Sequence, residues 1–174
     1  KESKERVRSA ILNSRLEFPA SRITVNLAPA DIPKSGGRFD LAIAVGILLA
    51  SGQLRRNQQQ QHSLNEKIAN LEFLGELALN GELGMVRGFL PAAMATCRAG
   101  RELIIPVQNT EEAGLLSESR IMTCHHLLEL CAFLAGEKSL EYVQPLEPVE
   151  KSRSHNFDDI VGQFQARRAL MIAA

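Results

Sequence analysis

Aromatic side chains are scarce in this 174-residue sequence, which has no tryptophan, one tyrosine and seven phenylalanines. Proteins that bind single-stranded nucleic acid by base stacking need aromatic platforms, so this sequence is poorly supplied for that mode of binding. Positive charge is not in excess either, because 20 Lys and Arg residues balance 20 Asp and Glu residues. A net charge of zero gives no indication of a broad basic surface for nucleic acid.

Cysteine and long apolar runs are also limited. The three cysteines are widely spaced and odd in number, which indicates reduced thiols and favours a cytoplasmic protein. No apolar run reaches the roughly 18 residues that a membrane-spanning helix needs, and no signal peptide is recognisable. The sequence begins at Lys1, not Met, and enters a helical pattern at once. We therefore expect a fragment of a longer chain that makes no contact with a membrane.

Apolar periodicity predicts a mixture of helices and strands. Helices are expected over 2–15, from Asp40 to near Gly52, over 91–99, from about Thr110 and over 125–134, and strands over 22–28, 71–79, 83–86, 102–105 and 120–123. Asn80-Gly81 predicts a hairpin turn, and Asn109 is expected to cap the helix that follows it. The glutamine-rich residues 55–70 are interpreted as a solvated loop or a variable insertion.

The order of these elements predicts an α+β fold, an α/β mixture that contains one hairpin. Residues 1–136 are expected to form one domain. Residues 137–155 contain Pro145, Pro148 and scattered charges without periodicity, which is typical of a linker. Residues 156–174 regain order in a helix that starts at Gln163 and runs to the chain end, as the first element of a truncated second domain.

A glycine loop, Gly36-Gly37, precedes the apolar helix that begins at Asp40. Glycines let backbone amides face a ligand and helix N-termini attract anions, so a phosphate or oxyanion site is one interpretation. The other is a tight turn that needs glycine for its backbone conformation. The turn is favoured, because Asp40 already places a negative charge at the helix N-terminus.

Metal-ligand residue types gather at Cys124, His125, His126 and Cys131. Structural zinc sites usually combine two ligand pairs, such as C-x₂-C with a second pair further along the chain, and no second pair occurs here. Cys131 also fits the apolar face of a helix. We therefore expect no metal site.

Five stretches, in this order, resemble the YifB/ComM group of bacterial AAA+ ATPases, which are magnesium-chelatase-like. They are KESKERVRSAI (1–11), RITVNLAPADIPKSGGRFDLAIAVGIL (22–48), LGELALNGEL (74–83), VRGFLPAAMA (86–95) and NFDDIVGQFQARRALMIAA (156–174). The last stretch resembles the start of an AAA+ module, in which a D-x-x-G-Q turn leads into the first helix. The resemblance implies a Walker A loop after Ala174 and an N-terminal portion before Lys1 that supplies strands this chain lacks.

Residues 1–136 also resemble the proteolytic domain of Lon. This resemblance implies a Lon-protease-like, ribosomal-protein-like two-layer α/β domain without its N-terminal strands. In Lon, a K-D-G-P-S-A-G loop carries a nucleophilic serine and a G-G-L-K-E-K stretch carries its lysine partner. In the matching segments of this chain, Phe39 stands at the serine position and Leu90 at the lysine position. A benzyl group cannot attack a carbonyl and an isobutyl group cannot accept a proton, so we expect a non-catalytic domain.

The family resemblance implies that the longer parent protein hydrolyses ATP with Mg²⁺ and works on DNA, through branch migration in recombination and natural transformation. It also implies a homo-oligomer, usually a hexameric ring. By the AAA+ pattern, Ile160, Val161, Gly162 and Gln163 lie near the adenine in the parent, whereas this chain alone binds neither nucleotide nor metal. Two alternatives stay open: a regulatory domain that binds a protein partner without DNA contact, and, less favoured, a Lon-like serine peptidase.

Overall fold

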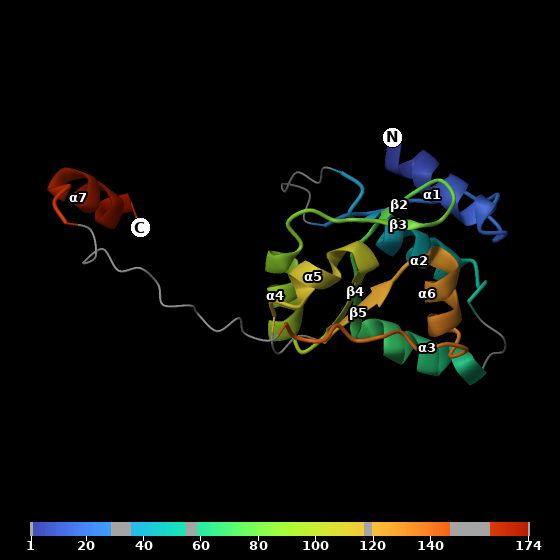
Figure 1. Cartoon of the computed structure of the whole chain (residues 1–174). Helices are drawn as coiled ribbons and strands as arrows, with labels where there is room; N and C mark the ends of the chain where they lie inside the picture. Colours follow the sequence, from blue (N-terminus) through green and yellow to red (C-terminus); the bar gives the residue numbers. More distant parts are fainter. Residues whose placement is uncertain (1, 29–35, 55–58, 117–119, 147–160, 174) are drawn as a thin grey trace.

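A computed structural model describes residues 2–28, 36–54, 59–116, 120–146 and 161–173. Three parallel strands form its main sheet in the order β1-β4-β5, with β1 at Leu71–Phe73, β4 at Glu102–Pro106 and β5 at Ile121–Cys124 (Figure 1). Leu71 pairs with Glu102, and Leu103 pairs with Ile121. The predicted mixture of helices and strands is therefore confirmed.

Helices cover both faces of this sheet, because its central strand is apolar on both sides. In β4, Ile104 belongs to one buried cluster, whereas Leu103 and Ile105 belong to another. The first cluster includes residues of α1 (Glu2–Asn13), α2 (Asp40–Ala50) and α6 (Leu127–Leu134). The second cluster includes residues of α4 (Leu90–Arg98) and α5 (Thr110–Ala113). A short 3₁₀ turn, η1 (Val107–Asn109), precedes α5. Parallel strands with apolar residues at successive positions need cover on both faces. The described residues thus form three layers, one more than the two-layer expectation.

A hairpin of β2 (Glu76–Leu77) and β3 (Leu83–Gly84) lies beside this sheet, and its turn contains Gly81 at φ +92°. The predicted hairpin is confirmed, but the single strand predicted over 71–79 is instead two strands in different sheets. The break lies at Gly75, whose N–H donates to Arg38 O and whose carbonyl accepts from Leu41 N. Hydrogen bonds to the start of α2 therefore replace the continuation of β1.

Residues 22–28 do not form the strand that their alternation predicts. All seven residues are exposed, and their backbone groups make no hydrogen bond to any other described residue. The side chains of Ile23, Val25 and Leu27 are 36%, 49% and 39% exposed. Alternation of apolar and polar residues indicates a preference for extended backbone, but a β-strand also needs a neighbouring strand with which to form hydrogen bonds. The prediction is wrong for this chain because no described strand lies alongside.

The predicted loop or insertion at 55–70 is also wrong over its described part, where α3 (Gln59–Ala69) forms. Leu64 is buried, and Ile68, four residues later and on the same helix face, packs against the first cluster. Lys67 Nζ donates to Phe133 O at 2.7 Å and lies 3.6 Å from the Phe133 ring centre. Two apolar residues at helical spacing are enough to anchor an otherwise polar helix. Residues 55–58 lie outside the described residues.

The predicted start of α5 at Thr110 is confirmed, but its cap and the start of α6 differ from the sequence prediction. Asn109 does not cap α5, because its side-chain amide bonds the backbone N and O of Val86 at 3.0 and 2.9 Å. Helix α6 begins at Leu127, after His126, whose Nδ1 accepts from Leu128 N at 3.0 Å. Since Nδ1 is an acceptor, the ring proton lies on Nε2, which donates to Asn80 O at 3.0 Å. His126 therefore caps α6 and joins it to the hairpin turn.

We expect His126→Ala to lower the free energy of unfolding by about 1 kcal/mol, the usual cost of losing an N-cap. Urea unfolding followed by circular dichroism measures this change. His125→Ala is the control, because its side chain is exposed and makes no hydrogen bond or ion pair with a described residue. Equal losses in the two variants would show that the cap at His126 contributes nothing.

The chain continues past α6 along the edge of the sheet. Thr123 N donates to Glu141 O at 3.1 Å and Val143 N donates to Ile121 O at 2.8 Å, and Leu140 and Val143 are buried. Residues 141–143 of the predicted linker thus pair with β5, and Leu146 N donates to Gly114 O at 2.8 Å. Residues 147–155 lie outside the described residues. Across the described ranges, no helix has both the length and the apolarity to cross a membrane.

The last helix, α7 (Phe164–Ala173), begins one residue after the predicted start at Gln163. None of its residues is buried, and Phe164 and Ile172 are 78% and 75% exposed. Figure 1 draws α7 apart from the other helices and the strands. The helix therefore presents an apolar surface that the described residues do not cover.

Candidate functional site

The loop before α2 and the loop before α4 meet at one pocket. It has a volume of about 230 Å³ and is lined by Gly36, Gly37, Arg38, Glu76, Met85, Val86 and Arg87. Arg38 Nη2 donates to Arg87 O at 2.8 Å and so joins the two loops. We call this site the arginine pocket. The resemblance to Lon matches the same two loops, so the structure brings together the segments that correspond to the reactive serine and lysine of Lon.

A buried ion pair holds the start of α2 beside this pocket. The Asp40 side chain is 1% exposed, and its Oδ2 accepts from Arg6 Nε at 2.7 Å. Ser3 Oγ donates to the other carboxylate oxygen. The hydrogen bond to Asp40 raises the pKa of Arg6 above its usual value, despite partial burial. Helix α1 is thereby tied to the first residue of α2.

Backbone conformation and close packing explain why Gly36 and Gly37 are glycines in the loop before α2. Gly36 has φ +78°, a conformation that side-chain-bearing residues rarely adopt. A Cβ on Gly37 would lie 2.4 Å from Glu76 Cγ, so the loop packs directly against that side chain. Together with the Asp40–Arg6 pair at the helix start, these contacts favour the tight-turn interpretation over a phosphate site.

Phe39 and Leu90 lie next to the arginine pocket without lining it. Phe39 is the half-buried residue before α2, and Leu90 is the first residue of α4 and packs against the second cluster. The charged groups at the pocket are instead Arg38, Glu76 and Arg87. A guanidinium cannot lose its proton in a protein, so neither arginine can act as a general base. The pocket can bind a charged group, but its described lining lacks the pair that acyl transfer needs.

Sequence reasoning missed these three charged side chains. Arg38 follows Gly37 and Arg87 precedes Gly88, so each arginine adjoins a loop glycine. That adjacency is a weak signal, because a charged residue in a loop is usually only solvated. Glu76 carried no signal at all, since it is one of several acidic residues on predicted strands.

We expect no peptidase activity from this chain. Both dyad positions are apolar, and the pocket between the two loops offers guanidinium groups in place of a nucleophile and its base. The measurement is release of fluorescent peptides from a labelled unfolded casein over several hours. Hydrolysis that is lost on substitution of Ser35, which lies outside the described residues, would contradict the prediction.

In the cysteine and histidine cluster, Cys124 and His126 make hydrogen bonds within the fold. Cys124 Sγ donates to His126 O at 3.3 Å, and His126 uses both ring nitrogens in the cap described above. Burial raises the pKa of Cys124 to about 12 and that of Cys131 to about 11, so both remain thiols at neutral pH. Among the residues with described positions, no three His, Cys, Asp or Glu side chains gather as metal ligands.

The residues predicted to lie near an adenine precede α7. Ile160 lies outside the described residues, Val161 is 95% exposed, and Gly162 and Gln163 have φ of +80° and +51°. None of the three described residues lines the arginine pocket. An exposed turn does not by itself enclose a nucleotide, so the role of these residues stays a prediction for the full-length protein.

Comparison with known proteins shows the relatives of this chain. Residues 1–109 match the family described as "Subunit ChlI of Mg-chelatase". All of the chain aligns with the uncharacterized protein YifB of Escherichia coli at 43% identity and, over 179 aligned positions, with the competence protein ComM of Haemophilus influenzae at 46%. An uncharacterized protein of Mycobacterium bovis, Mb2921c, is 34% identical over 99% of the chain.

These relatives are considerably longer than this chain of 174 residues. The chain spans 33% of the length of each of them. The alignments extend across the glycine loop, the hairpin and α7, because each covers all or nearly all of the chain. The chain therefore belongs to the YifB/ComM family of magnesium-chelatase-like proteins.

Proposed function

We propose that this chain is the non-catalytic N-terminal domain, with the beginning of the ATPase module, of an AAA+ ATPase of the YifB/ComM type. The observation that carries the proposal is the arginine pocket. The two loops that match the reactive segments of Lon in sequence meet there, and Phe39 and Leu90, which stand at the positions of the reactive pair, lie outside the lining. A scaffold that keeps its geometry and loses its chemistry is suited to binding or assembly. The same observation supports a Lon-protease-like fold for residues 1–136.

The parent protein, in this proposal, couples ATP hydrolysis to branch migration of DNA in recombination and natural transformation. The support is the 46% identity to a protein named for competence, across the whole of this chain. ATP and Mg²⁺ bind to the ATPase module of the parent, where Ile160, Val161, Gly162 and Gln163 lie near the adenine. The parent assembles as a homo-oligomeric ring, with six copies expected, in the cytoplasm.

Branch migration by the full-length parent tests this proposal. A labelled forked or four-way DNA is incubated with the parent and ATP, and the separated product strands are quantified. We expect ATP-dependent product from the parent and none from the 174-residue chain. Absence of product across three- and four-way junctions, from a parent that still hydrolyses ATP, would refute the DNA part of the proposal.

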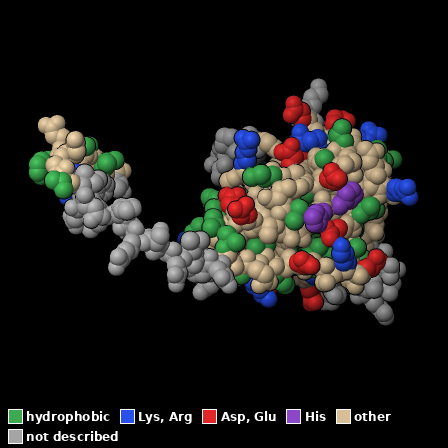
Figure 2. Space-filling model, in the orientation of Figure 1, with side chains coloured by type: hydrophobic (Ala, Val, Ile, Leu, Met, Phe, Trp, Pro, Cys, Tyr) green, Lys and Arg blue, Asp and Glu red, His purple; other side chains and the backbone are tan. Residues whose placement is uncertain are grey.

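A second candidate is a regulatory domain that binds a protein partner without touching DNA. The equal numbers of basic and acidic residues favour this candidate. On the face of the molecule drawn in Figure 2, the Lys and Arg side chains of the described residues are interspersed with Asp and Glu. Extended basic surface is the usual footprint of DNA binding, and this face does not offer one.

A mobility-shift assay separates the two candidates. Forked DNA is titrated with the full-length parent, with a version lacking residues 1–136, and with the Arg38→Glu/Arg87→Glu double variant. Arg98→Glu/Arg120→Glu is the matched control, because both arginines are exposed and lie outside the pocket lining. A loss of affinity in the pocket variant but not in the control assigns DNA contact to this domain. Unchanged affinity in all versions would exclude DNA contact by this domain and favour the second candidate.

A further inference from the structure

An apolar surface lies over α4 and α5. Its exposed side chains are Met94 of α4, Leu115 after α5, and Leu146, which are 43%, 65% and 50% exposed. Leu90 and Leu116 continue it inward, because both pack against the second cluster. Figure 2, in the orientation of Figure 1, shows hydrophobic side chains gathered over these two helices. We call this surface the α5 patch.

The end of α5 holds Leu115 outward. Gly114 N donates to Thr110 O at 2.9 Å, and Leu116 N donates to Ala113 O at 3.0 Å. Ala113 is buried and Leu116 packs against the second cluster, so the side chain between them faces solvent. One exposed leucine is ordinary, but a group of exposed apolar residues bordered by charged ones is typical of a protein interaction surface.

The chain leaves the domain beside this patch. Tyr142 pairs with Met122 of β5, and its hydroxyl donates to Glu102 Oε1 at 3.0 Å. Leu146 N then donates to Gly114 O at 2.8 Å, and a Cβ on Gly114 would lie 2.8 Å from Leu146 Cγ. The exit point is therefore bound to the end of α5, and Leu146 is part of the patch.

The segment that follows is short. Residues 147–160 connect Leu146 to the segment of α7, which the family resemblance assigns to the ATPase module. Even fully extended, they span only about 50 Å. A module on such a tether has an effective concentration on the order of millimolar at the patch, so a weak interface is enough for docking. This chain spans 33% of the length of its relatives, so a large remainder is available to cover the patch.

We propose that the α5 patch is the surface on which the ATPase module of the same polypeptide docks. The module places an apolar face over Leu115 and Met94. It places basic side chains opposite Glu111 and Glu112 of α5, which are exposed and half-buried. Complementary charges of this kind specify the partner. The inference rests on the proposed function for the existence of the module, but not on its ATP or DNA activity.

A second copy of this chain is a poorer occupant of the patch. In a two-fold contact the same patch meets itself, so Glu111 and Glu112 of one copy approach those of the other. Like charges that face each other across an interface are unfavourable. The acidic border therefore favours a partner of different composition.

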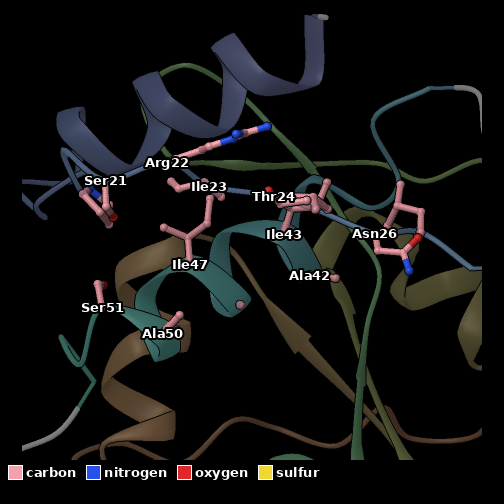
Figure 3. A pocket seen from close by; sticks show the side chains of 14 residues that line it. Ser21, Arg22, Ile23, Thr24, Asn26, Ala42, Ile43, Ile47, Ala50 and Ser51 are labelled. Atoms are coloured by element: carbon pink, nitrogen blue, oxygen red, sulfur yellow. The ribbon is translucent and has the colours of Figure 1, made fainter.

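The groove between residues 19–27 and α2 is a less suitable seat for the module. It has a volume of about 540 Å³, and Figure 3 shows Ile43 and Ile47 of α2 near the segment around Ile23. The strands that the family resemblance implies before Lys1 are the expected cover of this groove. Helix α2 belongs to the first cluster, whereas α4 and α5 belong to the second. Strands placed over α2 thus lie on the opposite face of the sheet from the α5 patch.

Maleimide labelling of Leu115→Cys tests the proposal, in the 174-residue chain and in the full-length parent. Mass spectrometry of the peptide that contains position 115 gives the labelling rate. We expect labelling in the parent to be on the order of 10-fold slower than in the chain, which corresponds to a module docked about nine-tenths of the time. Leu79→Cys is the matched control, because Leu79 is 57% exposed and lies in the hairpin, outside the patch. Its labelling rate should be the same in both proteins.

Three outcomes of the labelling would overturn the proposal. The first is equally rapid labelling of Leu115→Cys in chain and parent. The second is equal slowing at positions 115 and 79, which indicates general burial in an assembly. The third is slowing in the chain itself that rises with concentration alongside a dimer in sedimentation. Slow amide exchange in β4 confirms that each variant is folded.

Photo-crosslinking identifies the occupant independently of the cysteine variant. Benzoylphenylalanine replaces Leu115 in the parent, and equal amounts of ¹⁴N- and ¹⁵N-labelled protein are mixed before illumination. We expect crosslinks from position 115 to residues beyond Ala174, within one isotopic species. Crosslinks between the two species, crosslinks to residues 1–136, or no crosslink at all would overturn the proposal. Neither readout needs nucleotide or DNA, so a parent without branch-migration activity can still confirm it.

Discussion

Asp40→Ala is expected to lower the free energy of unfolding by about 3 kcal/mol, the lower end of the cost of breaking a buried ion pair. The Asp40 side chain is 1% exposed and accepts hydrogen bonds from Arg6 and Ser3, so its removal leaves two donors without their acceptor. Arg6 is 24% exposed and regains some hydration, which keeps the loss below the upper end of that range. Denaturant unfolding measured by circular dichroism gives the value.

Glu2→Ala is the matched control for this substitution. Glu2 also approaches Arg6, at 3.8 Å, but its side chain is 94% exposed. An exposed pair contributes at most about 0.5 kcal/mol on a helix, so the control should be nearly neutral. Arg6→Met in the Asp40→Ala background should cost less than Arg6→Met alone, because the guanidinium has then lost its partner already. Equal costs in both backgrounds would show that the Asp40–Arg6 contact contributes nothing to stability.

Gly81→Ala is expected to lower the free energy of unfolding by about 2–3 kcal/mol, the upper part of the range for a strained residue. Gly81 has φ +92°, where an L side chain is unfavourable. A Cβ there would lie 2.4 Å from Ser14 Oγ and 2.8 Å from His126 Cε1. His126 cannot move away without losing its bonds to Leu128 and Asn80, so the strain is not relieved cheaply.

Gly88→Ala separates the backbone cost from the steric cost. Gly88 also has positive φ, at +62°, but a Cβ there meets no atom within 4 Å. Its substitution should cost only about 1 kcal/mol, from the backbone conformation alone. A similar loss at both glycines would show that the contacts of Gly81 with Ser14 and His126 do not limit the hairpin turn.

The hairpin and the helix positions were predictable because their signals are local. Asn80-Gly81 is a turn dipeptide whose backbone conformation depends on the two residues themselves. The apolar spacing over Asp40–Ala50 likewise predicts a helix from its own residues, and α2 occupies that range. Residues 59–69 escaped prediction because only Leu64 and Ile68 mark the buried face of a polar helix.

The arginine pocket was predictable only in part. The resemblance to Lon singled out the loops before α2 and α4, and the structure joins them through Arg38 and Arg87. Which side chains line the pocket depends on the direction each loop takes after its glycine. That direction is determined by contacts distant in sequence, such as Gly37 against Glu76 and Gly75 against Leu41.

The amino-acid sequence by itself determined the family, the mixed α/β class and the absence of a reactive pair at Phe39 and Leu90, because these depend on residue identity and local order. Only the tertiary structure decided that residues 22–28 pair with no other described segment and that Asn109 bonds Val86 in place of capping a helix. Strand formation and side-chain hydrogen bonding both require a partner at the right distance. That partner is brought there by the packing of elements far apart in the chain.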